Sequence, residues 1–117
     1  MAIIDKPSDF FKPKLYTGNG SSSHGITGVG FAPNWTWIKE RSQTESHFLF
    51  DAVRGNNKYI NSNGTGQEYT ESGGMAFNSD GFTLGSWNSV NENSQTYVSW
   101  NWKANGQGSS NTDGSTN

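Results

Sequence analysis

Residues Phe31 to Gly55 read FAPNWTWIKERSQTESHFLFDAVRG, and this stretch decides the fold. It contains two segments with strand-like alternation, Trp35 to Arg41 and His47 to Val53, joined by a polar connection. Clusters of Gly, Ser, Asn and Thr stand on both sides of the stretch, and such clusters stop regular structure. The stretch therefore predicts an isolated antiparallel hairpin.

The side chains of this hairpin alternate between two faces. The first strand places Trp35, Trp37, Lys39 and Arg41 on one face and Thr36, Ile38 and Glu40 on the other. Neither face is wholly apolar, so we expect partial cover on both sides. The second strand places Phe48, Phe50 and Ala52 on one face, which suits a central strand of a sheet.

Short strand candidates recur about every ten residues along the rest of the chain, separated by turn residues. They are residues 14–17, 26–31, 58–60, 68–70, 82–84 and 96–104. The last alternates most clearly, with Val98, Trp100, Trp102 and Ala104 on one face, and indicates a half-buried strand that closes a sheet. Because no window has sustained helical periodicity, we predict an all-β fold, an antiparallel sandwich with little or no helix.

The composition is that of one small domain. The chain has 117 residues, of which 30% are hydrophobic, and its five Trp, four Tyr and seven Phe provide the material for a core. We expect about three in four of the tryptophans to be core residues, as is common for this residue class. Pro7 and Pro13 suggest an N-terminal arm over residues 1–13, followed by the sandwich over 14–104 and a Gly/Ser/Asn-rich linker or tail over 105–117.

Charge and cysteine content exclude several classes of function. The net charge is -2 and the eight Lys and Arg form no run, so we expect no nucleic-acid partner. No segment is long and apolar enough for a membrane span, and the opening residues lack the pattern of an export signal, so we expect no membrane insertion. The absence of Cys removes disulfides, thiolate metal sites and Cys nucleophiles.

Catalytic, cofactor and metal patterns are equally weak. The carboxylates form no pair of the kind a glycosidase needs, and His24 and His47 have no partner at ligand or triad spacing. Asn78 to Gly81 begins like a calcium loop but lacks the closing glutamate, so a turn is the better interpretation. We therefore expect a non-enzymatic chain with no cofactor and no metal.

Several blocks together resemble a known family. KPSDFFKPKLYTGNG, FAPNWTWIKERS, SHFLFDAVRG, SDGFTLG and YVSWNWKANG look like a domain at the N-terminal end of tail-fibre or appendage-type structural proteins of marine tailed bacteriophages. The similarity spans Lys6 to Gly106, with Asn101 as a departure where the family pattern is Trp-Cys-Trp. It implies a jelly-roll sandwich similar to concanavalin or SPRY domains, and a place in the virion after synthesis in the host cytoplasm.

Five residues are the candidates for contact with a ligand or partner. Phe10 and Phe11 in the arm are candidates for docking onto a neighbouring virion subunit, and Trp87 in a turn-rich stretch is the best candidate for an exposed sugar-stacking ring. Arg41 and Arg54 are candidates for gripping an acidic sugar or a subunit, although a structural bridge with Asp51 across the hairpin is the favoured interpretation.

The expected function follows from these observations. We expect a virion structural protein, a tail fibre, appendage or head-decoration module, that acts in assembly, in host attachment or in both. Its partners would be other virion subunits and further copies of itself, since closed homo-oligomers are common. The alternative is a lectin-like, receptor-binding module that recognises a glycan of the host surface. A small glycan-degrading enzyme is a third class, and nothing in the sequence favours it.

Overall fold

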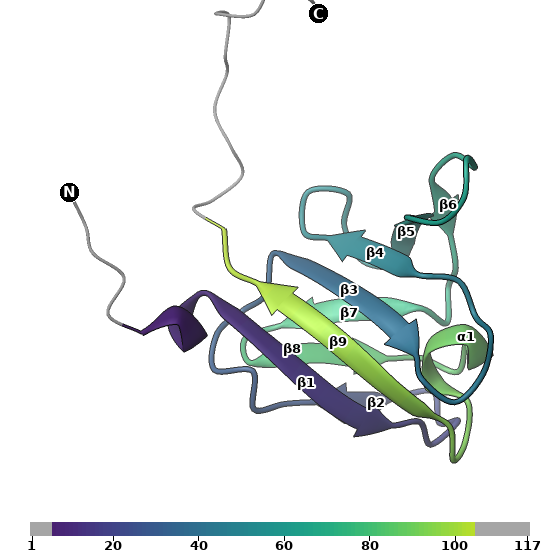
Figure 1. Ribbon diagram of the computed structural model, residues 1–117, viewed down its shortest axis with the longest axis horizontal. Coiled ribbons are helices and arrows are strands. Elements are labelled where there is room, and N and C mark those ends of the chain that lie inside the picture. The colour runs from purple at the N-terminus through teal and green to yellow at the C-terminus, as the bar shows by residue number, and fades with distance from the viewer. Residues whose placement is uncertain (1–5, 105–117) are drawn as a thin grey trace, which may run out of the picture.

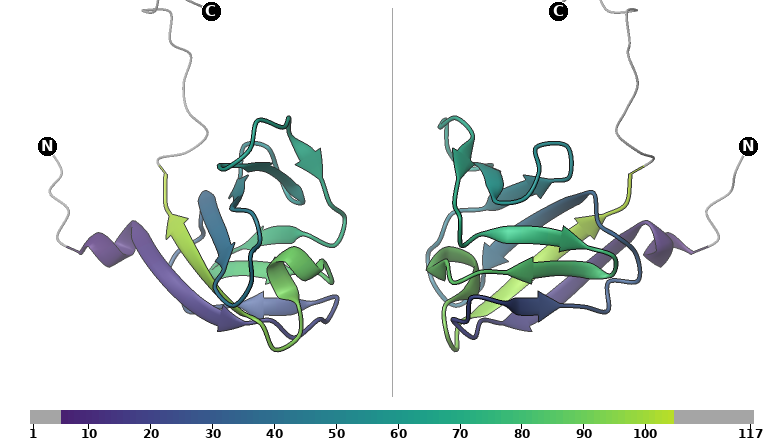
Figure 2. Two further views of the ribbon diagram at one scale, coloured as in Figure 1. Left: turned by 45° about the vertical axis from the view of Figure 1, so that its right-hand side comes forward. Right: turned by 180° about the vertical axis from the view of Figure 1, so that it is seen from behind.

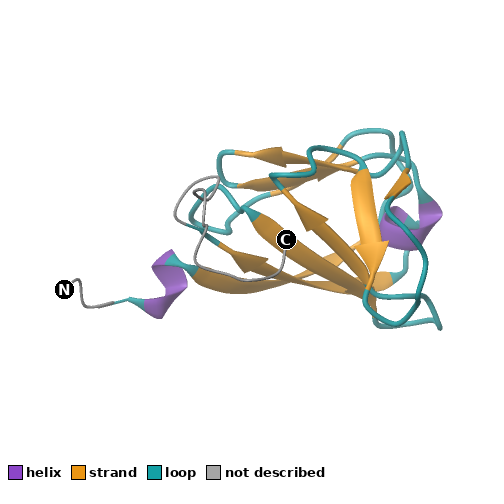
Figure 3. Ribbon diagram, turned by 90° about the horizontal axis from the view of Figure 1, so that it is seen from above, coloured by secondary structure: helices purple, strands orange, loops and turns teal. Residues whose placement is uncertain are grey.

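The computed structural model describes residues 6–104, which form two antiparallel sheets packed face to face (Figures 1 and 3). Within these residues the six-stranded sheet has the order β1-β9-β3-β4-β5-β6 and the three-stranded sheet the order β2-β8-β7. The strands are β1 (Phe11–Thr17), β2 (His24–Ile26), β3 (Trp35–Glu40), β4 (Phe48–Asp51), β5 (Lys58–Asn61), β6 (Tyr69–Thr70), β7 (Met75–Asn78), β8 (Gly81–Leu84) and β9 (Thr96–Trp102). The predicted all-β sandwich is confirmed.

The hairpin predicted from the opening stretch is β3 paired with β4. The two strands are antiparallel, with Trp35 opposite Asp51 and Ile38 opposite Phe48. β4 lies between β3 and β5, so it is a central strand as expected. Its Phe48 and Phe50 are buried and point between the sheets, as the alternation predicted.

The core lies between the two sheets. The three-stranded sheet covers it on the side that faces the viewer in the right panel of Figure 2. Its buried members come from both layers: Ile26, Ile38, Phe48, Phe50, Met75, Phe82, Leu84, Val90 and Tyr97. Tyr16 stacks on Tyr97 with ring centroids 5.0 Å apart. Aromatic residues thus supply much of the buried apolar surface that a chain poor in aliphatic residues needs.

β9 carries a polar face toward the interior, contrary to the expectation that its tryptophans belong to the core. Ser99 and Asn101 are fully buried, whereas Trp100 and Trp102 on the opposite face are only half-buried. The Asn101 side chain accepts a hydrogen bond from Thr36 Oγ1 at 2.9 Å and donates to the Lys12 carbonyl at 3.1 Å. These bonds satisfy the amide in the interior, so the tryptophans face outward.

Residues 11–13 of the N-terminal arm predicted over 1–13 belong to the six-stranded sheet. A 3₁₀ turn, η1 (Pro7–Asp9), leads into β1, which already begins at Phe11. Phe11 pairs with Trp102 and Pro13 with Trp100. Pro13 is tolerated because β1 is an edge strand, where a missing N–H donor costs little. Residues 1–5 and the predicted linker at 105–117 lie outside the described residues.

The strand predicted over residues 26–31 is wrong in its bounds, because β2 spans His24–Ile26 and includes only Ile26 of the predicted segment. Beyond it, Gly28 and Gly30 adopt positive φ angles of 83° and 90°, which glycine allows at little cost. Their N–H groups donate to the two carboxylate oxygens of Asp80 at 3.0 and 2.7 Å. The backbone therefore bonds to the Asp80 side chain, in the turn between β7 and β8, instead of continuing a strand. The turn predicted at 78–81 is confirmed.

Asp80 gives a first prediction. The hydrogen bonds from Gly28 and Gly30 lower the pKa of its carboxyl group, so the ionised form is favoured in the folded chain. The stability that this provides is present above the pKa of the unfolded state and is lost as the pH falls through the lowered folded value. We expect Asp80→Asn to lower the urea midpoint at pH 7 more than at pH 3. An equal loss at both pH values would contradict the ionic part of this account.

Two elements were not predicted. β7 (Met75–Asn78) follows Gly73 and Gly74 and buries Met75, while α1 (Asn88–Asn91) is a single helical turn that buries Val90 and Asn91. Both span only four residues, which is too few to show the periodicity that identifies a strand or a helix. α1 caps the end of the sandwich beside the polar pocket described below.

Glu40 is a buried carboxylate at the end of β3. It is 1% exposed, its Oε1 accepts from Ser42 Oγ at 3.3 Å, and its Oε2 has no hydrogen-bond partner among residues 6–104. Burial is the main cause that raises the pKa of Glu40, and the charges of Glu45 and Glu92 add to it while Lys39 opposes them. The ionised form is therefore disfavoured in the folded state.

Glu40 gives a second prediction. A raised folded pKa means that this group contributes stability below its unfolded pKa, and that the contribution is lost as the pH rises through the folded value. We expect Glu40→Gln to increase the free energy of unfolding at pH 7 by about 1 kcal/mol, since it removes an uncompensated buried charge. At pH 4 the variant should gain much less. Urea denaturation at both pH values measures this, and a loss of stability at pH 7 would contradict it.

Candidate functional site

Four tryptophans gather on the outer side of the six-stranded sheet, and we call this surface the tryptophan face: Trp35, Trp37, Trp100 and Trp102. They come from the neighbouring strands β3 and β9, where Trp35 pairs with Trp102 and Trp37 with Trp100. The Trp35 and Trp102 rings stack at 4.5 Å, whereas the Trp37 and Trp100 rings meet at 5.6 Å with an angle of 70°. The surface is therefore continuous but not flat.

The tryptophan face continues onto the edge strand β1. Phe11 packs its ring 5.0 Å from that of Trp102, and Leu15, which alternates onto the same side, is 60% exposed. An apolar hollow of about 240 Å³ opens between Trp37, Trp100 and Trp102. At its border the Trp37 Nε1–H donates to His47 Nδ1 at 2.9 Å, which fixes the indole and the tautomer of His47. The hollow is therefore apolar, and one of its three indoles is held by a hydrogen bond.

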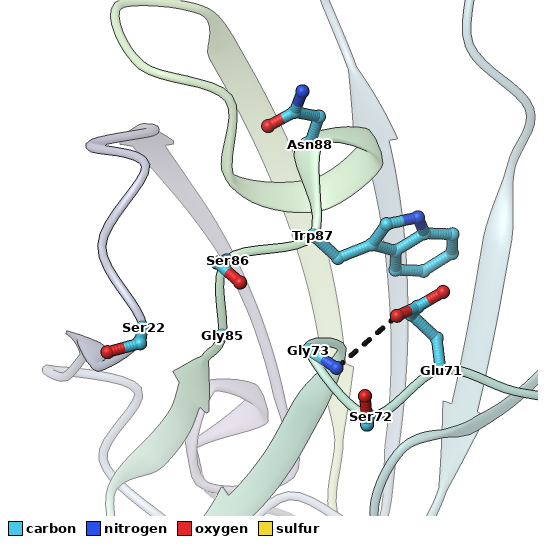
Figure 4. Close-up of a pocket in the computed structure, with 8 residues that line it drawn as sticks. All are labelled: Ser22, Glu71, Ser72, Gly73, Gly85, Ser86, Trp87 and Asn88. Atoms are coloured by element: carbon cyan, nitrogen blue, oxygen red, sulfur yellow. Dashed lines mark hydrogen bonds between the residues drawn. The ribbon is translucent and has the colours of Figure 1, made fainter.

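A second and larger hollow, the polar pocket, lies at the end of the sandwich beside α1 (Figure 4). Its volume is about 520 Å³, and three loops supply its lining residues: Ser22, Glu71, Ser72, Gly73, Gly85, Ser86, Trp87 and Asn88. The Gly73 N–H donates to Glu71 Oε1 over a long 3.4 Å. The lining thus carries three hydroxyls, one amide and one carboxylate around an open concave site.

The backbone around the polar pocket is tightly fixed. The fully buried Asn91 donates through Nδ2 to the carbonyls of Ser21 and Gly85 at 3.0 and 2.9 Å, so one side chain joins two walls of the pocket. The Trp87 N–H donates to the Gly73 carbonyl at 3.0 Å. A Cβ atom at Gly85 would lie 2.5 Å from the Gly73 carbonyl oxygen, so this approach requires glycine.

Trp87 lines the polar pocket, but it does not present a free ring. Its indole contacts the rings of Phe48 and Tyr59, with centroids 4.8 and 4.9 Å away, and packs against the core. Figure 4 shows the indole pointing over Glu71. Trp87 is therefore half-buried and not the fully exposed ring that its position in a loop suggested. Its contact with a ligand stays a prediction.

The predicted brace at Asp51 and Arg54 is present, although Arg41 takes no part in it. Arg54 Nε contacts Asp51 Oδ2 at 2.6 Å, and its Nη1 lies 3.5 Å from Glu68. Arg41 is exposed and follows β3 at the turn end of the hairpin, whereas Asp51 pairs with Trp35 at the open end. The antiparallel register therefore separates Arg41 from Arg54, and the two do not form one cationic site.

Arg54 gives a third prediction. The side chains of Arg54 and Asp51 are 32% and 24% exposed, and bridges of this kind contribute roughly 0–1 kcal/mol. We expect Arg54→Ala to lower the free energy of unfolding by about 0.5–1 kcal/mol, since Glu68 also loses a partner. Arg41→Ala is the matched control and should change it by less than about 0.5 kcal/mol. Equal effects of the two substitutions in thermal unfolding would contradict a bracing role for Arg54.

Phe10 and Phe11 point in different directions. Phe10 is 43% exposed, with Lys103 Nζ 5.8 Å from its ring centroid, while Phe11 joins the tryptophan face. The structure thus brings one of the five sequence-predicted contact residues, Phe11, together with the outward-facing tryptophans. Trp87 lies at the polar pocket, and Arg41 and Arg54 lie at neither surface.

A family model described as a domain of unknown function, DUF7483, matches residues 6–117. The chain belongs to this family. No curated protein and no solved structure matches this DUF7483 chain.

Apart from Trp87, sequence reasoning missed the residues that line the polar pocket of this DUF7483 chain. Ser22, Ser72 and Ser86 stand in Gly/Ser-rich turns, which identify loops but not which loops meet. Within residues 6–104 no helix could span a membrane, and no group of three or more His, Asp or Glu side chains is placed to hold a metal ion. Within the described residues, we therefore base the interpretation of function on two surface features, the apolar hollow of the tryptophan face and the polar pocket.

Proposed function

We propose that this DUF7483 chain is a non-enzymatic structural module of a tailed-phage virion, which docks through its tryptophan face onto a neighbouring virion subunit. The outward-facing cluster of Trp35, Trp37, Trp100 and Trp102 is the observation that carries this proposal. The resemblance of the chain to tail-fibre and appendage domains supports a place in the virion. Assembly into the particle follows synthesis in the host cytoplasm.

The chemistry of the tryptophan face favours a protein partner over a glycan. The hollow between Trp37, Trp100 and Trp102 is lined by indoles alone, whereas a saccharide needs polar groups that bond its hydroxyls. The angle of 70° between the Trp37 and Trp100 rings also prevents a flat stacking platform. An apolar side chain of the partner, inserted into the hollow, matches the aromatic anchors that dominate protein interfaces.

Association also accounts for the exposure of this surface. Leu15 and Trp35 are 60% and 37% exposed on one side of a sheet, and contiguous apolar patches of this kind mark interaction sites. Burying apolar area contributes about 25 cal/mol per Å², and the rigid indoles lose little conformational entropy when they are covered. Copies of the chain in the particle are related by its symmetry.

The fourth prediction tests this function. Mass spectrometry of tailed particles, purified from a culture that expresses the gene, should find the chain in fixed stoichiometry with the other structural proteins. Particles that lack it would overturn the virion assignment.

The contact surface is tested by Leu15→Ser and Trp100→Ser. The matched control is Val53→Ser, because Val53 is 69% exposed but does not line the apolar hollow. Hot-spot truncations cost about 2 kcal/mol or more, so we expect incorporation of the two face variants to fall at least about tenfold. Val53→Ser should be incorporated normally. Circular dichroism verifies folding of each variant, and normal incorporation of folded Leu15→Ser and Trp100→Ser would contradict docking through this face.

A further inference from the structure

The polar pocket has a chemistry that the docking function does not use. It is separated from the tryptophan face, because Trp87 packs on the inner side of the six-stranded sheet whereas Trp100 faces outward. Its lining offers the hydroxyls of Ser22, Ser72 and Ser86, the amide of Asn88 and the carboxylate of Glu71. We propose that the polar pocket is a binding site for a neutral saccharide.

The polar groups of the pocket are available to a ligand. The hydrogen bonds within residues 6–104 include none made by the hydroxyls of Ser72 and Ser86 or by the side-chain amide of Asn88, and Glu71 makes one long contact, 3.4 Å to the Gly73 N–H. Hydroxyls donate and accept, the amide does both, and the carboxylate accepts strongly. A sugar ring presents paired hydroxyls of the same dual character, so it can bond to several of these groups at once.

The lining also excludes other classes of small molecule. It contains no Lys or Arg, and Glu71 repels anions, so phosphates, sulfates and acidic sugars do not fit. Trp87 is the one large apolar side chain in the lining, too little for a lipid or another apolar ligand. The volume of about 520 Å³ lies within the usual 300–1,000 Å³ of small-molecule sites and accommodates a sugar ring or two.

The frame of the pocket is pre-organised, which lowers the entropic cost of binding. The buried Asn91 fixes the loops of Ser21 and Gly85, and the close approach of Gly85 to Gly73 fixes the third segment. The His24 ring also contacts Asn91 Oδ1 through Nδ1 at 2.8 Å, so β2 is tied to the same centre. The pocket lies on loops, and the buried Asn91 holds these loops in place. The site is therefore both exposed and rigid.

The test uses the folded chain and neutral methyl glycosides of glucose, galactose, mannose and rhamnose, together with N-acetylglucosamine. Glucuronic acid and N-acetylneuraminic acid are the charged comparators. Saturation-transfer NMR detects contact, and titration calorimetry gives Kd. We expect at least one neutral sugar to bind with a Kd of about 1 mM, which is typical strength for a site that binds one ring through a few hydrogen bonds.

Two variants locate the binding. Glu71→Gln keeps the shape of the side chain and removes its charge, and Asn88→Ala removes the amide, so each should weaken binding at least about tenfold. Trp100→Ser is the matched control on the tryptophan face and should keep Kd within about twofold. Unchanged melting curves show that the effects are local.

Three results would overturn the proposal. They are no binding of any neutral sugar at about 10 mM, binding lost in Trp100→Ser but kept in Glu71→Gln, and equal or tighter binding of the acidic comparators. None of these outcomes bears on incorporation into particles, because they report sugar binding by the isolated folded chain, whereas incorporation is measured on purified particles. The saccharide site and the docking function can therefore be confirmed or contradicted independently.

Discussion

The buried polar ladder on the inner face of β9 is the constraint on which the rest of the structure depends. Asn101 bonds to Thr36 on one side and to the Lys12 carbonyl on the other, and Ser99 Oγ donates to the Lys14 carbonyl at 3.2 Å. These groups are fully buried, so a partner lost from any of them would leave a polar atom unsatisfied at a cost of about 1–3 kcal/mol. The ladder therefore fixes the alternation of β9 and its position between β1 and β3.

The outward tryptophans follow from that constraint. Side chains alternate with a period of two, so a strand that turns Ser99 and Asn101 inward must turn Trp100 and Trp102 outward. A slip by one residue would bury the indoles, but it would expose Tyr97, whose hydroxyl donates to the Asn88 carbonyl at 2.9 Å and whose ring stacks on Tyr16. The interior beneath β9 is thus adapted to one tyrosine and small polar groups.

The sequence predicted the sandwich, the β3–β4 hairpin and the Asp51–Arg54 brace because each depends on local alternation or near neighbours. It could not predict which face of β9 is buried, since hydrophobicity favours the tryptophan side and the bonds of Asn101 are to residues far away in the chain. The unusual Asn between two tryptophans was the available signal. The polar pocket was equally hidden, because Ser22, Glu71 and Ser86 meet only after three loops converge.

The two surfaces suit different kinds of partner because they differ in how water is displaced. The tryptophan face has few polar groups, so covering it releases water from apolar surface and needs a shaped, apolar counterpart that a folded protein can supply. The polar pocket keeps hydrogen-bonding groups that water already satisfies, so a ligand gains only by replacing several of those bonds together. Strong attachment is therefore expected at the tryptophan face and weak, selective recognition at the pocket. Since Trp87 packs on the inner side of the sheet and Trp100 lies outside, occupation of one surface leaves the other accessible.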